Sequence, residues 1–211
     1  MRGIEDCLMH LYEPILPVRH LHIDSGLIWR ILLLLALLLA APFLAGCRHN
    51  EPAMAAVAGV TLTLSSASLQ DGRVPRENTC DGNDASPPLK WTAPPSGTKS
   101  FALTVTDPDA PSGTFTHWVL FNLPADRSSL PAGVPKQGQL ADGSRQGRND
   151  FGKVGYGGPC PPRGAPHRYV FTLYALDREL EVTAGAARSQ VESTMNGHVL
   201  ARSELTARYG R

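Results

Sequence analysis

Two acidic side chains and an imidazole lie close together in one short stretch, DPDAPSGTFTH, which runs from Asp107 to His117. Carboxylates and imidazoles gathered at one place can move protons, ligate a metal ion or orient a bound anion. Each residue alone is unremarkable, because Asp-Pro commonly opens a turn and a strand histidine is usually a hydrogen-bonded core residue. The stretch therefore indicates a site only if a second group with matching chemistry joins it.

A second stretch supplies such groups. Residues 149–166 are rich in glycine and proline and lead into His167 and Tyr169, which alternate on one face of an expected strand. A glycine-rich backbone beside a histidine and a tyrosine can offer amide donors to an anion. The alternative is a Pro-Gly connection whose histidine merely caps the strand.

Two strands must position the first stretch. Residues 101–107 alternate between apolar and polar types, so Phe101, Leu103, Val105 and Asp107 share one face. The second strand, residues 115–123, is apolar on both sides, and period-two spacing places five residues on one of its faces: Phe115, His117, Val119, Phe121 and Leu123. If the two strands are antiparallel neighbours, Asp107 and His117 lie at the same end of the sheet.

Composition favours β structure for the rest of the chain, because 18 prolines and 20 glycines indicate many turns. Further strands are expected at 61–65, 89–91 and 204–209, with surface loop and short strands over 124–150 and a helix within 183–196. The 20 Lys and Arg residues nearly balance the 19 Asp and Glu residues. We find no basic stripe with interleaved aromatics, so no nucleic-acid partner is expected.

The amino end reads as an export segment. An uncharged apolar run from Ile31 ends in Leu44-Ala45-Gly46-Cys47, which resembles the lipobox of bacterial lipoproteins. We expect residues 1–46 to be a signal sequence, 47–60 a lipidated Cys47 with a flexible tether, and 61–211 the folded domain. The acidic residues before Arg30 suggest that translation starts downstream of Met1. A plain signal-anchor helix is the alternative.

Cys80 and Cys160 remain as a pair after export. An even pair in an oxidising compartment predicts a disulfide, and two reduced buried thiols are the alternative. Neither cysteine has a second cysteine or histidine at finger-like spacing, so a zinc finger is not expected.

Three ordered motifs together resemble the phosphatidylethanolamine-binding protein (PEBP) family, in its bacterial Raf-kinase-inhibitor-like (YbhB/YbcL-type) branch. They are DPDAP at 107–111, His117-Trp118, and GGPCPPRG at 157–164 followed by His167-Arg168-Tyr169. The resemblance runs from about Leu62 to the carboxyl end and implies a mostly β fold, a sandwich of two packed sheets with a few peripheral helices. It also implies a small anion pocket, with Asp109 at its border and five ligand residues: Asp107, His117, Gly158, His167 and Tyr169. Cys160 stands where animal members have a pocket glycine.

The function we expect is non-catalytic binding of a small anion, a phosphate or a phosphate-ester headgroup, without cofactor or metal. Asp107 would orient an imidazole rather than meet the anion. The expected location is the periplasmic side of the bacterial envelope, at the outer membrane, through the lipid on Cys47. Three alternatives stay open: a regulator or inhibitor of an envelope protease or other enzyme, a hydrolase using Asp and His as acid and base, and a metal site formed by His117, His167 and an Asp. The hydrolase lacks an evident nucleophile, because no G-x-S-x-G motif is present.

Overall fold

The computed structural model describes residues 61–211. The expected signal sequence, lipidated Cys47 and tether lie outside these residues. None of the helices within 61–211 combines the length and apolar character that crossing a membrane requires.

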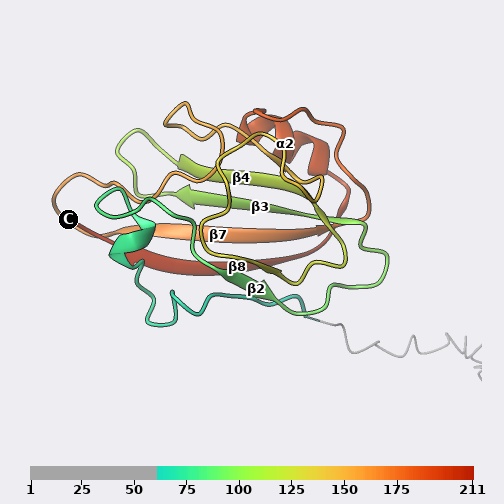
Figure 1. Ribbon diagram of the computed structural model, residues 1–211, viewed down its shortest axis with the longest axis horizontal. Helices are drawn as coiled ribbons and strands as arrows, with labels where there is room; N and C mark the ends of the chain where they lie inside the picture. Colours follow the sequence, from blue (N-terminus) through green and yellow to red (C-terminus); the bar gives the residue numbers. More distant parts are fainter. Residues whose placement is uncertain (1–60) are drawn as a thin grey trace, which may run out of the picture. The chain divides into compact units, whose positions relative to one another are not determined.

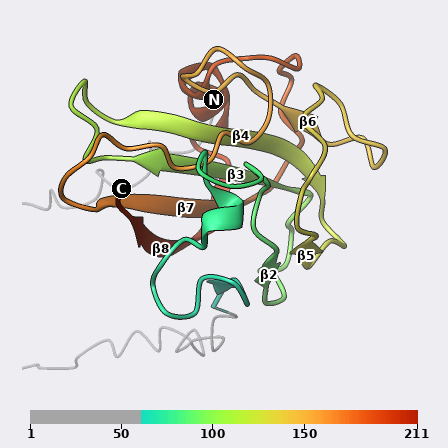
Figure 2. The same ribbon diagram turned by 60° about the vertical axis from the view of Figure 1, so that its left-hand side comes forward.

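Two antiparallel sheets form the domain (Figure 1). The smaller sheet has the order β1-β2-β5, with β1 at Leu64–Ser65, β2 at Leu89–Trp91 and β5 at Ser129–Leu130. The larger sheet has the order β6-β4-β3-β7-β8, formed by β6 (Arg145–Gln146), β4 (Phe115–Pro124), β3 (Ser100–Asp107), β7 (His167–Leu176) and β8 (Val199–Tyr209). Figure 2 shows β2 and β5 in a separate layer from the long strands. The mostly β, two-sheet prediction is confirmed.

Helical structure is sparse. Residues 61–211 contain one α-helix, α2 at Arg188–Met195, and one 3-10 turn, η1 at Arg76–Asn78. Helix α2 lies within the predicted range 183–196 and buries Val191 and Met195. The chain leaves it through Gly197, whose φ of 79° suits a residue without a β-carbon.

The larger sheet separates two hydrophobic cores. Its face toward β1, β2 and β5 packs the larger core, which includes Trp91, Phe101, Leu103, Trp118 and Phe171. Its other face packs against α2, and this second core contains Ala102, Val119, Phe121, Val191 and Met195. Burial on both faces explains why β4 reads as an almost continuous apolar run.

Two irregularities interrupt the pairing of β3 with β4. Val105 pairs with Trp118 and Thr106 with Thr116, so His117 is an extra residue on β4, a β-bulge. A second register shift lies where Leu103 pairs with Leu120 and Phe101 with Leu123. The prediction of one uninterrupted face for β4 is therefore wrong. Leu123 packs in the larger core with Trp118 and Leu120, whereas Val119 and Phe121 pack in the second.

The carboxyl-terminal part of β8, the outermost strand beside β7, is crossed by an earlier segment. The Val74 amide donates to the Arg208 carbonyl at 2.9 Å, and the Arg208 amide donates to the Gly72 carbonyl at 2.9 Å. Nearer the start of β8, the Leu64 amide donates to Ser203 Oγ at 2.9 Å. Residues of β1 and of the connection between β1 and β2 thus cover part of the free edge of the larger sheet.

The predicted disulfide is present in the fold. Cys80 and Cys160 lie at bonding distance, with sulfur atoms 2.08 Å apart and a sequence separation of 80. Beside the bridge, the Cys80 amide donates to the Pro159 carbonyl at 3.1 Å, and Tyr156 Oη donates to the Asn78 carbonyl at 2.7 Å. The loop around η1 is therefore joined to the glycine-rich loop that precedes β7.

Candidate functional site

Three neighbouring strands bring the predicted residues to one end of the larger sheet. Asp107 ends β3, His117 lies near the start of β4, and His167 and Tyr169 lie at the start of β7. β3 pairs antiparallel with both β4 and β7, so these ends coincide, as predicted. In Figure 1 they lie at the left-hand end of the sheet, near η1. We call Asp107, His117, His167 and Tyr169 the Asp107 cluster.

Asp107 and His167 form a buried pair. Asp107 Oδ2 lies 2.7 Å from His167 Nδ1, and the side chains are 4% and 12% exposed, respectively. The other carboxylate oxygen, Oδ1, accepts the Asp109 amide at 2.8 Å. An ionised carboxylate only accepts hydrogen bonds, so Nδ1 of His167 carries the hydrogen. Asp107 thereby fixes the ring's orientation and leaves Nε2 as the ring atom for a ligand.

His117 is buried and held from two sides. Its Nδ1 lies 2.7 Å from the Gly157 carbonyl, which can only accept, so Nδ1 carries the hydrogen. The Gly157 amide in turn donates to the His117 carbonyl at 2.8 Å, which satisfies the backbone of the bulge. Three aromatic rings surround the imidazole with centroid distances of 5.1 to 5.3 Å: Tyr169, Phe115 and Phe151.

The protonation of His117 follows from these surroundings. Burial lowers its pKa below the ordinary value of 6.5, although the Gly157 carbonyl and the charge of Asp107 act in the opposite direction. The imidazole is therefore neutral near pH 7, and its Nε2 is a hydrogen-bond acceptor unless a ligand brings a proton.

Tyr169 contributes a buried hydroxyl. Its side chain is fully buried, and within residues 61–211 its Oη makes no well-formed hydrogen bond, although the Asp107 carboxylate lies close to it. Burial, and then the negative charge of Asp107, raise the pKa of Tyr169 well above its usual value, so the phenol stays protonated. Two other buried side-chain atoms of the described chain share this lack of a partner, Asn78 Oδ1 and Trp91 Nε1, and both lie outside the Asp107 cluster. An unmade hydrogen bond in the interior is costly, so a polar ligand is the fitting partner for this donor.

Asp109 borders the cluster but is committed to Arg168. Its Oδ2 accepts the Arg168 amide at 2.8 Å and its Oδ1 accepts Arg168 Nη2 at 2.6 Å. The side-chain hydrogen bond from Arg168 is the first cause that lowers the pKa of Asp109 to about 2. This clamp ties the loop after β3 to β7, and the amide of the clamped Asp109 holds Asp107. Asp109 is therefore a positioning residue.

Gly158 lies beside His117 in the sequence-predicted position, yet its amide is engaged. It donates to Asp84 Oδ1 at 2.6 Å, and Asp84 Oδ2 pairs with Lys136 Nζ at 2.5 Å. A β-carbon at Gly158 would lie 2.6 Å from the Asn78 carbonyl oxygen, so the loops meet too closely for any side chain. In this structure the Gly158 amide serves an internal carboxylate, whereas the sequence predicted it as a donor to an anion.

Several residues around the cluster were not assigned from the sequence. Phe115 and Phe151 flank His117, Arg168 clamps Asp109, and Asp84 takes the Gly158 amide. Arg168 lies within the recognised His167-Arg168-Tyr169 motif, so its position gave a signal. Phe151 gave none, because an aromatic residue in a glycine-rich loop has no strand periodicity to place it.

The alternative chemistries can be compared with this geometry. Within residues 61–211, no group of three or more His, Cys, Asp and Glu side chains is arranged to hold a metal ion. Both histidines of the cluster use Nδ1 for Gly157 or Asp107 rather than for a hydroxyl or thiol. Cys160 is bonded to Cys80, so in this state it offers no thiolate for nucleophilic attack.

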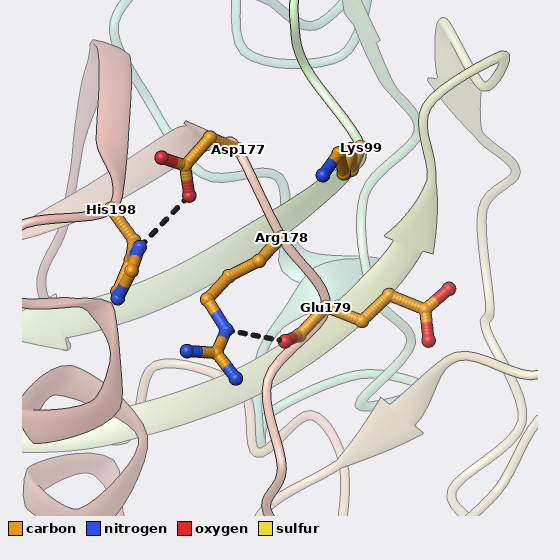
Figure 3. Close-up of a pocket in the computed structure, with 5 residues that line it drawn as sticks. All are labelled: Lys99, Asp177, Arg178, Glu179 and His198. Carbon is orange, nitrogen blue, oxygen red and sulfur yellow. Dashed lines mark hydrogen bonds and ion pairs between the residues drawn. The ribbon is translucent and has the colours of Figure 1, made fainter.

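A separate hollow of about 470 Å³ lies at the other end of the larger sheet (Figure 3). Lys99 precedes β3 and Asp177, Arg178 and Glu179 follow β7, so these lining residues are remote from the Asp107 cluster along the strands. His198 completes the lining, and its Nδ1 lies 2.9 Å from Asp177 Oδ1. This second His-Asp pair, which is partly exposed, offers a control for experiments on His167.

Comparisons with known proteins agree with the fold and the motifs. The family model for phosphatidylethanolamine-binding protein matches residues 64–210. A UPF0098 protein of Methanothermobacter thermautotrophicus is 52% identical over 151 residues, covering 71% of this chain and 99% of the relative. The UPF0098 protein YbhB of Escherichia coli is 44% identical over 158 residues, covering 70% and 99%.

Solved structures give the same answer. The crystal structure of E. coli YbcL, described as a new member of the mammalian PEBP family, superposes with a TM-score of 0.67 at 35% identity, covering 71% of this chain and 98% of YbcL. A putative PEBP homologue from Chlamydia trachomatis, CT736, gives a TM-score of 0.65 at 37% identity, covering 72% and 98%. Both the sequence match and the two-sheet fold therefore show that the chain belongs to the phosphatidylethanolamine-binding protein family.

Proposed function

We propose that this chain is a non-catalytic binding protein that holds a small oxyanion, a phosphate or a phosphate-ester headgroup, at the Asp107 cluster. The observation that carries the proposal is the buried Tyr169 hydroxyl, which makes no well-formed hydrogen bond within residues 61–211 although it lies near Asp107. It lies against His117, with ring centroids 5.1 Å apart. A phosphate oxygen would supply a well-placed acceptor for this hydroxyl. The family's name, which refers to a phospholipid headgroup, agrees with this ligand class.

The protonation state of the phosphate should determine how well it binds at the Asp107 cluster. Neutral His117 presents an Nε2 acceptor, and Asp107 places a negative charge in the cluster, so a fully ionised phosphate meets repulsion. A phosphate that carries a hydrogen can donate it to Nε2, or transfer it and form an imidazolium. At a pH where the phosphate form that predominates in solution has one hydrogen fewer than the bound form, binding should take up one proton from solution, so affinity for inorganic phosphate should rise as the pH falls. Calorimetry in buffers with different ionisation enthalpies measures that uptake.

Two tyrosines give a matched test by calorimetry with inorganic phosphate and phosphoethanolamine. Tyr169→Phe removes the buried hydroxyl that makes no well-formed hydrogen bond. We therefore expect phosphate and phosphoethanolamine to bind about tenfold more weakly, with the free energy of unfolding unchanged or higher. Tyr156→Phe removes a buried hydroxyl that donates to the Asn78 carbonyl, so stability should fall by about 1 kcal/mol while phosphate affinity stays. Unchanged affinity in Tyr169→Phe, with binding intact in the wild type, would contradict the role of this hydroxyl.

The histidine pairs give a second comparison in the same assay. His167→Ala should abolish measurable phosphate binding, whereas His198→Ala, which removes the partly exposed partner of Asp177, should bind as the wild type does. If the wild type and His167→Ala both show negligible binding of either ligand, the proposal of an anion site is abandoned.

Anchoring in the bacterial envelope is the second part of the proposal. Its support is the apolar run from Ile31 followed by Leu44-Ala45-Gly46-Cys47, which resembles a lipobox. Cells fed a radioactive fatty acid should label the wild type at the outer membrane but not Cys47→Ser. Label retained by Cys47→Ser, or no label in either protein, rules the lipid anchor out.

Regulation of an envelope protease or another enzyme remains an alternative. It predicts a protein partner and no dependence on the Tyr169 hydroxyl. A chain that ignores phosphate and phosphoethanolamine but inhibits a co-purified envelope protease would favour this alternative over anion binding.

A further inference from the structure

We infer that the Cys80–Cys160 disulfide is a redox control on anion binding at the Asp107 cluster, an inference that rests on the proposed function. Cys160 lies within the segment 157–167, and each end of that segment holds one histidine of the cluster. At one end Gly157 accepts from His117 Nδ1 at 2.7 Å. At the other end His167 bonds Asp107 at 2.7 Å. The disulfide is thus the covalent fixed point between the supports of both imidazoles.

The segment has few other supports. Within the described chain, residues 161–166 make no backbone hydrogen bond, and residues 162–166 are exposed. The Cys80 amide, which donates to the Pro159 carbonyl at 3.1 Å, is the neighbouring polar contact. Without the covalent bond, the stretch between Pro159 and His167 depends on few contacts, and a segment of this kind opens at low free-energy cost.

The partner loop is, by contrast, firmly attached to the fold. Beside Cys80, Asp81 Oδ2 accepts Tyr209 Oη at 2.6 Å and lies 3.1 Å from Arg211 Nε. After Cys80, the Asp84 carboxylate accepts the Gly158 amide. Before it, the carbonyl of the buried Asn78 accepts the Tyr156 hydroxyl. The disulfide therefore joins a weakly supported segment to a well-supported one. Breaking the disulfide should make this segment less ordered without unfolding the core.

The bridge is also accessible. Cys80 and Cys160 are both exposed, whereas the side chains of the larger core are nearly all shielded from solvent. A thiolate can reach the sulfur atoms without unfolding of the sheets.

The chemical step is thiol-disulfide exchange with a dithiol reductant. A thiolate of the dithiol attacks one sulfur of the bridge and forms a mixed disulfide, and the other protein sulfur leaves as a thiolate and takes up a proton. The second thiol of the reductant then displaces the remaining protein sulfur. Two electrons and two protons pass to the protein, giving Cys80 and Cys160 thiols, and the reductant ends as its own disulfide.

Reduction should weaken anion binding, because ordering the freed segment costs conformational entropy. In the reduced protein, an anion must immobilise the residues between Pro159 and His167 as well as bind the histidines, so part of its binding free energy is consumed. Coupled sites in proteins typically influence each other by about 5-fold to 150-fold, and we expect a value near the lower end, about tenfold weaker binding on reduction. Linkage requires the reverse effect of equal size: saturating phosphate should make the disulfide about tenfold harder to reduce at equilibrium.

The test uses the full-length chain with Cys7→Ser and Cys47→Ser, so that Cys80 and Cys160 are the remaining cysteines. Phosphate affinity is measured by calorimetry before and after treatment with a small dithiol, and again after reoxidation. We expect about tenfold weaker binding in the reduced state and full recovery on reoxidation. The reduction equilibrium, followed by thiol titration with and without saturating phosphate, should shift by the same factor.

A chain with Cys80→Ser and Cys160→Ser added serves as the matched control. It should bind phosphate as the reduced protein does and show no response to the dithiol. Tryptophan fluorescence reports folding in each sample. If the oxidised chain does not bind phosphate, the proposed function fails; if oxidised and reduced chains bind equally, the redox control fails and the function stands. Loss of binding that coincides with global unfolding on reduction also overturns the inference, because the bridge is then structural.

Discussion

At His117, three features act on one imidazole. The bulge adds the residue to the strand, the Gly157 carbonyl fixes its tautomer, and the rings of Phe115, Phe151 and Tyr169 remove it from water. All three features are made by uncharged groups. A neutral imidazole, held by packing and one hydrogen bond, is the state from which a proton-carrying anion can be recognised.

This environment gives a pH prediction for stability. The pKa of His117 is lowered in the folded protein, whereas in the unfolded chain it returns to about 6.5. Below 6.5 the unfolded chain binds a proton that the folded state resists, so the unfolding free energy should fall as pH decreases from 6.5 toward the lowered pKa. Above 6.5 this contribution is complete and constant. Denaturant melts between about pH 5 and pH 8 measure the slope.

His117→Asn is the variant for comparison, because an asparagine amide can still donate toward Gly157 but does not titrate. Its unfolding free energy should depend less on pH than that of the wild type. His198→Asn, at the partly exposed pair with Asp177, is the control and should keep most of the wild-type slope. Equal slopes in wild type and His117→Asn would show that His117 does not titrate differently in the two states.

At this scale, strand periodicity and proline positions placed Asp107 and His117 at one end of neighbouring strands, and the family resemblance added His167 and Tyr169 to them. It did not reveal that Asp84, 74 residues before Gly158, takes the glycine's amide. Nor did it reveal the Arg168 clamp on Asp109, 59 residues away. Such contacts depend on how loops cross after the sheets have packed, and no local pattern records that.

Among the elements, β4 departs most from its sequence pattern. Its two register shifts let Trp118, Leu120 and Leu123 enter one core and Val119 and Phe121 the other. Simple alternation could not predict this, because a bulge moves every later residue to the opposite face. β8 was also underestimated: it begins at Val199 rather than at 204, and its pairing with β7 overrides the weak propensity of its charged residues.

Asn122, at the second shift, gives a prediction for this element. It has a φ of 56°, its Oδ1 accepts the Leu180 amide at 2.8 Å, and its Nδ2 donates to the Leu180 carbonyl at 3.0 Å. Asn122→Ala removes both hydrogen bonds and strains the backbone, so unfolding free energy should fall by about 2 to 4 kcal/mol.

Asn122→Gly separates the two causes in the same denaturant melts. It loses the hydrogen bonds but tolerates the positive φ, so it should be about 1 kcal/mol more stable than Asn122→Ala. An alanine variant at least as stable as the glycine variant would show that backbone strain is unimportant here.

On the scale of the whole molecule, the two sheets and their two hydrophobic cores stabilise the domain, and the disulfide lies at its surface. Both cysteines are exposed, and neither core includes them. The family fold was predictable from the sequence motifs. The contribution of the bridge to stability is a separate question from its effect on binding.

Removing the bridge should cost stability mainly through the unfolded chain. Closing a loop with a sequence separation of 80 restricts the unfolded ensemble, and chain-entropy estimates put the effect at about 4 kcal/mol as an upper value. Cys80→Ser with Cys160→Ser should therefore unfold at lower denaturant concentration but remain folded in buffer. Equal midpoints for this variant and the oxidised wild type would contradict the estimate.

The covering of β8 has a consequence for how copies of this chain behave in concentrated solution. A long bare strand edge is a template on which another copy can add a strand, the first step toward aggregation. Here the hydrogen bonds of the Val74 and Arg208 amides form a short parallel bridge on the carboxyl-terminal part of that edge. The Leu64 amide donates to the hydroxyl of Ser203. Two backbone hydrogen bonds and one hydrogen bond to a side chain thus leave less of the edge for intermolecular growth, so solubility at high concentration depends on a connection beside the end of β7 that carries His167 and Tyr169.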